Sequence, residues 1–240
     1  MASTIAAITT SGGGVVTTAD ATGNLNLLAG TTTVVALTTA GAAVSGTLSA
    51  TLDATIYGVT VGLGGGAVST NTAVGASALV ANTTADENVA IGALAMTSTT
   101  TGNAQVAVGR SALRDNTTGS ENTAVGRTTL AGNTTGNLNS GMGRGVLQNN
   151  TTGSSNTADG AFALFSNTTA SNNTAVGYQA GYTNTAAATT AFGSQALYSN
   201  TTGTQNTAVG RVALYSNTTG ANNIAMGLQA LYTNSTGSQN

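Results

Sequence analysis

The sequence predicts an all-β protein: a repeat β-solenoid (β-roll) of 17-residue coils, preceded by a segment of short strands. Two observations predict it. A glycine that follows an apolar pair returns every 17 residues, with one step of 16 between Gly177 and Gly193. A fixed period of this size is the signature of stacked structural repeats. Between these glycines lie small and β-branched residues followed by NTTG-type turn sequences, which is typical of one coil of strand and turn per period.

The composition narrows the possible functions. Charged residues make up 5% of the 240 residues, the net charge is −2, and all basic residues are arginines. No basic patch is available for a nucleic acid, and no apolar run approaches the length of a membrane span. The chain contains no Cys, His or Lys, so the usual bases, thiolates and Schiff-base amines are missing. We therefore expect no enzyme activity, no cofactor, no bound metal, no nucleic-acid partner and no membrane insertion.

Residues 1–70 do not carry the repeat. They alternate short apolar runs with Gly, Ser and Thr, as in GGGVVTTAD and IYGVTVGLGGG, a pattern that indicates short strands and turns. Bulky side chains are too sparse here for an isolated core. We expect this segment to associate with other copies of itself and to form a first domain over 1–70.

The coils occupy residues 71–240 as ten repeats, numbered so that the recurring glycine is position 5 of each coil. Position 3 is nearly always Ala, position 4 is usually aliphatic and position 9 is mostly Leu. Neighbouring strand residues point to opposite faces, so positions 3 and 4 lie on different faces. We interpret the aliphatic face as the core of the coil. The predicted core columns are Val74, Ile91, Val108, Val125, Val176 and Val209 at position 4, and Leu79, Leu113, Leu130 and Leu214 at position 9.

The Ala and Gly face would then be a contact between subunits, although the two faces could be exchanged. Each coil carries about two large apolar side chains, which is thin for a free-standing solenoid. We therefore expect an intertwined parallel homotrimer. The last coil lacks a capping sequence, and solenoids need polar caps for solubility, so we expect the shaft to continue beyond Asn240.

Two features of the coils are candidate sites. Position 10 becomes aromatic in the later coils, which predicts a ladder of rings at Phe165, Tyr182, Tyr198, Tyr215 and Tyr232. Packing between coils or subunits is the favoured interpretation, and a sugar-stacking strip is the alternative. Asp159 stands at position 4, where its neighbours are aliphatic. A locally irregular, hydrated coil is favoured there over a cation held by three copies.

The repeat NTAVGxxAL resembles the SVAIG-type head repeats of trimeric autotransporter adhesins, over residues 71–240. That family folds as a trimer of β-rolls. The opening SGGGVVTTADATGNLNLLAGTTTVVALTTAG resembles the amino-terminal segment of tail-fibre and virion structural proteins of tailed bacteriophages, and repeats such as NTAVGYQAGYTNT also occur in phage fibres. An autotransporter needs an export signal, which the opening residues do not resemble. The phage resemblance is therefore favoured.

The expected function is that of a phage tail-fibre shaft, located in the virion and made in the host cytoplasm. Residues 1–70 would bind a tail or baseplate protein, and a distal tip outside this sequence would bind a host surface receptor. The alternative is a cell-surface adhesin or extracellular filament, which gene neighbours would distinguish. A more remote alternative is an ice-binding solenoid, because Thr recurs in the NTT turns.

Overall fold

The computed structural model describes residues 4–7, 15–19, 25–26, 54–56 and 59–240, and side chains from residue 61 onward. The chain divides into two units, Met1–Ser49 and Ala50–Asn240. In the first unit, β1 (Thr4–Ala7), β2 (Val15–Ala19) and β3 (Leu25–Asn26) form an antiparallel sheet. Most of the remaining predicted short strands of residues 1–70 lie outside the described residues.

The second unit is a β-solenoid closed at its amino-terminal end by a hairpin. β4 (Ala54–Ile56) and β5 (Val59–Gly62) pair antiparallel, and β5 pairs antiparallel with β6 (Thr72–Val74). A single turn of 3-10 helix, η1 (Gly65–Ala67), follows. These strands belong to the same sheet as the coils, so the boundary predicted between residues 70 and 71 is corrected to one near residue 50.

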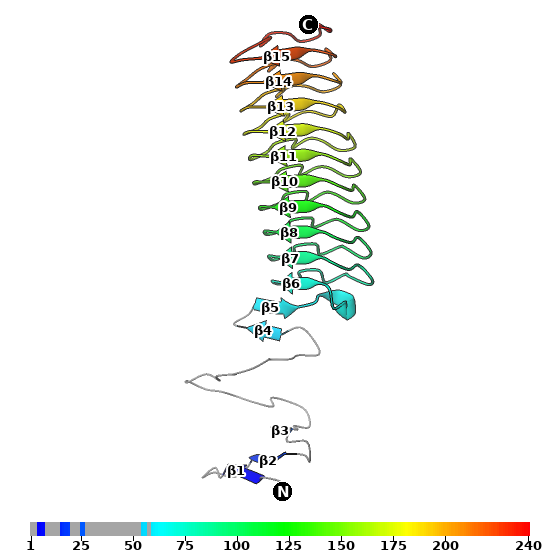
Figure 1. Cartoon of the computed structure of the whole chain (residues 1–240), viewed down its shortest axis with the longest axis vertical. Helices are drawn as coiled ribbons and strands as arrows, with labels where there is room; N and C mark the ends of the chain where they lie inside the picture. Colours follow the sequence, from blue (N-terminus) through cyan, green and yellow to red (C-terminus); the bar gives the residue numbers. More distant parts are fainter. Residues whose placement is uncertain (1–3, 8–14, 20–24, 27–53, 57–58) are drawn as a thin grey trace. The chain divides into compact units, whose positions relative to one another are not determined.

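Ten parallel strands, one per repeat, continue this sheet from β6 to β15 (Figure 1). Val74 pairs with Ile91, Ile91 with Val108, and Val108 with Val125. The prediction of one coil per repeat, stacked in register, is confirmed. The strands after β6 are β7 (Val89–Ile91), β8 (Val106–Val108), β9 (Thr123–Val125), β10 (Ser140–Met142), β11 (Thr157–Asp159), β12 (Thr174–Val176), β13 (Thr190–Phe192), β14 (Thr207–Val209) and β15 (Ile224–Met226).

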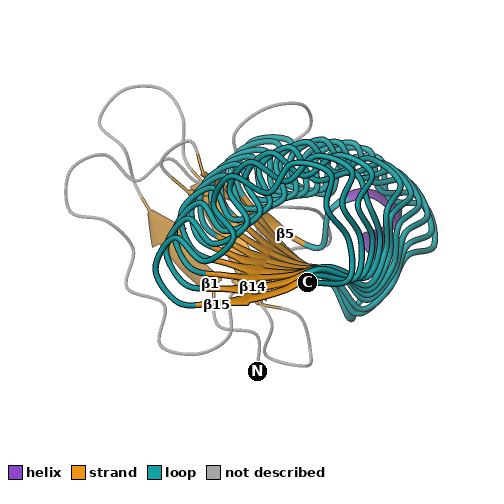
Figure 2. Cartoon of the chain, turned by 90° about the horizontal axis from the view of Figure 1, so that it is seen from above, coloured by secondary structure: helices purple, strands orange, loops and turns teal. Residues whose placement is uncertain are grey.

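The strands form one wall of the coil, and the remaining residues close it (Figure 2). The interior side of this wall carries the alanines of position 3, such as Ala107 and Ala124, which are fully buried. The aliphatic residues of position 4 point outward. The predicted core column is therefore wrong for Val74, Ile91, Val108, Val125, Val176 and Val209, which are all half-buried or exposed.

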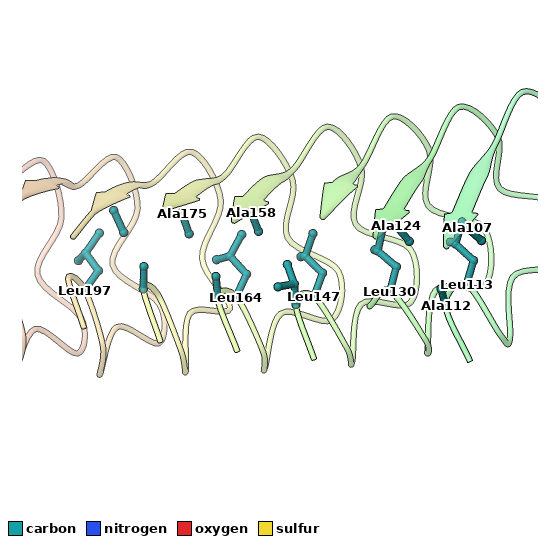
Figure 3. Close-up of a cluster of buried hydrophobic side chains, with 14 of the residues drawn as sticks. Ala107, Ala112, Leu113, Ala124, Leu130, Leu147, Ala158, Leu164, Ala175 and Leu197 are labelled. Carbon is teal, nitrogen blue, oxygen red and sulfur yellow. The ribbon is translucent and has the colours of Figure 1, made fainter. Parts of the chain in front are cut away.

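The alanines are inside because the coil is flat. Across the interior from the strand wall stand a second alanine, at position 8, and the leucine of position 9 (Figure 3). Leu79, Leu113, Leu130 and Leu214 are completely buried. The predicted leucine column is thus confirmed as core. A leucine on one wall leaves room for only a methyl group on the other, at the packing density of protein interiors.

One coil shows this complementarity because its position 3 residue is smaller than usual and its position 8 residue is larger. At position 3 it has Gly141 in place of Ala, and at position 8 it has the larger Val146, after Thr129 in the coil before. A Cβ added to Gly141 would lie 2.8 Å from Thr129 Cγ2 and 3.3 Å from Val146 Cγ1. The missing methyl group on one wall therefore accommodates the extra atoms on the other.

The other half of the interior is polar. It contains buried asparagines at positions 1 and 12, which form two columns along the solenoid. Asn139 and Asn150, one from each column, both donate to the carbonyl oxygen of Gly153, at 2.8 and 2.9 Å. In the position 12 column, Asn150 Nδ2 also donates to Asn133 Oδ1 at 2.7 Å, and Asn133 Nδ2 to Asn116 Oδ1 at 2.9 Å. The asparagines thus form hydrogen bonds with backbone carbonyl groups and with one another.

The 16-residue coil interrupts this polar column. It begins at Asn173 and has one threonine fewer in its turn than its neighbours. The amide chain resumes from Asn200 to Asn184. The side-chain oxygen of Asn167 and the side-chain nitrogen of Asn173 are buried there without a hydrogen-bond partner. The missing residue therefore interrupts the column of hydrogen-bonded asparagines, while β12 and β13 remain paired in register.

The corners of each coil require unusual backbone. The position 5 glycines have φ between 113° and 138°, a region that side chains rarely enter. Residues with φ near 50–60° recur at positions 7, 9 and 17, for example Thr128, Leu130 and Glu121, although left-handed backbone is uncommon outside glycine. Their amides donate to neighbouring coils, at 3.0 Å to Arg110 O, 2.9 Å to Val146 O and 2.9 Å to Asn103 O. Inter-coil hydrogen bonds thus stabilise each strained corner.

Candidate interaction surface

The predicted aromatic ladder exists as a continuous stack on the outside of the later coils. The successive ring pairs of Phe165, Tyr182, Tyr198, Tyr215 and Tyr232 have centroids 5.0–5.2 Å apart and planes within 9° of parallel. The spacing matches the separation of adjacent strands, about 4.8 Å. Phe162 meets the first ring edge-on, with centroids 5.7 Å apart.

In this stack each ring covers the face of the next. A sugar binds an aromatic residue through an open ring face, and within the ladder only the edges of the inner rings are available. Burial raises the pKa of the Tyr198 hydroxyl, with smaller contributions from the charges of Tyr215, Tyr182 and Tyr178. The arrangement favours inter-coil packing and disfavours a sugar-stacking strip.

The strand face is the outward surface formed by positions 2 and 4 of β6–β15. Position 4 presents a row of aliphatic and aromatic side chains, with Met142 55% exposed, Phe192 53% and Met226 74%. Position 2 is mostly Thr or an aliphatic residue. Val61 of β5 extends the row by pairing with Val74. This is a continuous, mainly apolar strip along the solenoid.

Asp159 is the one charged residue on the strand face. It ends β11, is exposed, and pairs in the sheet between Met142 and Val176. The coil that carries it keeps its strand register. The prediction of a distorted coil at Asp159 is therefore not supported, while its hydrated carboxylate agrees with the expectation.

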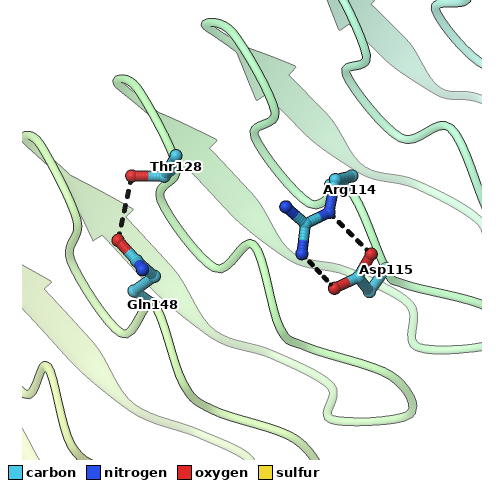
Figure 4. Close-up of polar contacts among 4 residues, drawn as sticks. All are labelled: Arg114, Asp115, Thr128 and Gln148. Atoms are coloured by element: carbon cyan, nitrogen blue, oxygen red, sulfur yellow. Dashed lines mark hydrogen bonds and ion pairs between the residues drawn. The ribbon is translucent and has the colours of Figure 1, made fainter.

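The arginines at position 6 lie just beyond the glycine bend, at the rim of the strand face: Arg110, Arg127, Arg144 and Arg211. The guanidinium carbon of Arg144 is 5.3 Å from the ring centroid of Phe162 in the next coil. Among the described residues the one ion pair joins Arg114 and Asp115, which are exposed neighbours in the chain (Figure 4). Nearby, Thr128 donates to Gln148 at 3.0 Å.

The threonines of the NTT turns have a structural role. The position 13 hydroxyls donate to the backbone of the following coil, as Thr117 does to Thr134 O at 3.1 Å and Thr134 to Thr151 O at 3.0 Å. These hydroxyls are thus engaged within the protein. The pattern gives no support to an ice-binding array on the turns.

Over the part of the chain that the structure describes, no three His, Cys, Asp or Glu side chains are grouped closely enough to hold a metal ion. No helix within that part is long and apolar enough to cross a membrane. Comparisons with protein families, curated proteins and solved structures find no match.

Proposed function

We propose that this chain forms the shaft of a homotrimeric bacteriophage tail fibre. The segment before the solenoid, residues 1–49, attaches the shaft to a tail or baseplate protein, and a distal tip outside this sequence binds the host receptor. The supporting observation is the mainly apolar strand face, which continues along the stacked coils from β6 to β15. The role is mechanical: the shaft holds the tip at a distance from the particle.

The strand face is large enough to be an interface. Ten strands at about 4.8 Å, each presenting a strip on the order of 10 Å wide, make an area of roughly 500 Å². Exposed apolar patches above a few hundred Å² usually mark interaction sites. Three copies arranged about one axis cover this face on each chain, with the position 4 residues innermost. The aliphatic face, and not the Ala face, is then the contact between subunits.

Light scattering on the full chain tests the assembly. The expected mass is three times that of the 23.1 kDa chain. Val209→Asp should dissociate the trimer, because it places three unpaired carboxylates at the axis. Thr219→Asp, which adds the same charge to an exposed turn, is the matched control. A monomeric, folded full chain would contradict the proposal.

The location is tested on particles. Antibodies against the recombinant chain should label the tails of purified virions in electron micrographs. Deletion of residues 1–30 should leave the coils folded but abolish incorporation into particles. Labelling of cell surfaces without virions would support the adhesin alternative, and normal incorporation of the deleted chain would place the attachment elsewhere.

A further inference from the structure

The inference rests on the proposed trimer and concerns the axial register, that is, which coils of neighbouring chains lie at the same height. A shaft made of near-identical coils can slide past its neighbours by one coil and still pack an apolar row against an apolar row. Apolar contacts therefore distinguish the registers weakly. Parallel assemblies with this problem commonly use a polar residue or charge pair at one layer.

One layer of this solenoid differs from the rest. Among positions 2 and 4 of β6–β15, Asp159 alone is charged. Val is the commonest residue at its position, and its neighbours in the row are Met142 and Val176. The exposed Asp159 carboxylate has no ion-pair partner among the residues that the structure describes.

A complementary charge lies in the same layer. Arg144 belongs to the preceding coil, but its guanidinium lies over Phe162, which is in the coil of Asp159. Arg144 is exposed at the rim of the strand face and, like Asp159, makes no ion pair with any side chain in the described part of the chain. For the other position 6 arginines the position 4 residue of the following coil is uncharged: it is Val125 after Arg110, Met142 after Arg127 and Met226 after Arg211.

We propose that Arg144 of each copy pairs with Asp159 of a neighbouring copy, and that this layer sets the register of the trimer. In register, three such pairs neutralise the carboxylates at the axis. A slip of one coil places Asp159 against Met142 or Val176 of the neighbour and leaves both charges unpaired. Removing one partner from a buried pair is strongly unfavourable, so slipped registers are rejected.

Disulfide trapping measures the register directly, because the chain contains no cysteine. T123C and S140C place single thiols at position 2 of β9 and β10, and both sites are exposed. A one-coil slip moves a thiol by about 4.8 Å, which is about twice the width of the range of Cα separations, roughly 4.4–6.8 Å, that a disulfide tolerates. The two full-length variants, carrying different tags, are mixed, reassembled and oxidised. Homodisulfides report the aligned register and T123C–S140C heterodisulfides report the slipped one.

Homodisulfides should exceed heterodisulfides by at least about tenfold, since a slip leaves buried charges unpaired. D159V, which restores the commonest residue of the repeat, should keep the trimer but raise the heterodisulfides to comparable amounts. R144A should do the same, whereas R127A, the matched control, should leave the ratio unchanged. The charge exchange R144D/D159R should restore the original ratio.

The outcomes separate this inference from the proposed function. A trimer whose ratio is unaffected by D159V or R144A overturns the register role and leaves the shaft intact. Failure of R144D/D159R to restore the ratio overturns the pairing. A full chain that is monomeric by light scattering and forms no disulfide between copies overturns both proposals.

Discussion

The two halves of the coil interior are equally buried but are held together by different forces. On one side Leu130 belongs to a buried hydrophobic cluster that contains alanines of both walls. On the other, Asn133 is bonded through its amide to Asn116, Asn150 and the Gly136 carbonyl. The hydrophobic half is stabilised by area removed from water. The asparagine half is stabilised because nearly all of its buried donors and acceptors find partners, the exceptions being Thr99 Oγ1, Asn167 Oδ1 and Asn173 Nδ2. An interior this thin can thus be filled with amides as well as with aliphatic groups.

The sharpest way to break the polar half is to replace a donor with an acceptor. Asn133→Asp should lower the free energy of unfolding by about 3–5 kcal/mol, since the carboxylate can donate neither to Asn116 Oδ1 nor to Gly136 O and is buried without a cation. Urea denaturation followed by circular dichroism measures the loss. Asn149→Asp, at an exposed site, is the control and should change little. Equal effects at both sites would contradict the buried ladder.

The hydrophobic half is broken by deleting volume. Leu130→Ala should lower the free energy of unfolding by about 2–4 kcal/mol, through lost burial and the cavity left between the walls. The control is Leu138→Ala, because Leu138 is 55% exposed and, like Leu130, has a left-handed backbone. A loss at Leu138 as large as that at Leu130 would mean that backbone conformation, and not burial, is responsible.

The complementarity of the two walls is tested by restoring the common residue. Gly141→Ala should lower the free energy of unfolding by about 1–3 kcal/mol, because the added methyl group overlaps Thr129 and Val146. Adding Thr129→Ala and Val146→Ala to the same chain should recover much of the loss. A denaturation series of the single, double and triple variants gives the coupling. Additive losses would show that the walls do not compensate.

The aromatic ladder lies outside both halves of the interior, and we expect it to contribute less to the free energy of unfolding. Tyr215→Ala removes two stacked contacts and should lower the free energy of unfolding by about 1–2 kcal/mol. Tyr215→Phe should be nearly neutral, since ring area and not the hydroxyl makes the stack. A large loss in the Phe variant, measured by the same denaturation, would assign the stabilisation to the hydroxyl instead.

The smallest expected effect is a dependence on alkaline pH. Burial raises the pKa of Tyr198 in the folded chain above the 10.0 of a free tyrosine. Its contribution to stability is fully present below pH 10 and is lost as the pH rises through the folded value, because the unfolded chain ionises first. Absorbance titration at alkaline pH should show a tyrosine that ionises late and that Tyr198→Phe removes. A wild-type titration identical to that of the variant would exclude the shift.

The polar half also marks what sequence reasoning missed. The asparagines of position 12 begin the NTTG-type turn sequences, and the structure shows them stacked inside the coil. No role was predicted for their partners at position 1, such as Asn139, although these residues recur with the same period. A polar residue that returns at every period beside small residues is the signal that identifies such a ladder. The proposed pairing of Arg144 with Asp159 of a neighbouring copy likewise required the position of the guanidinium beside Phe162.

The sequence by itself determined the period, the single strand per coil, the glycine at the bend, the leucine column and the run of rings, because each depends on residues repeating at fixed spacing. Only the tertiary structure decided which strand face is inside. Alternation separates two faces but does not orient them, and the choice here depended on the opposite wall. There, buried leucines leave space for a methyl group only. The valines are therefore outside, where they are available to other copies of the chain.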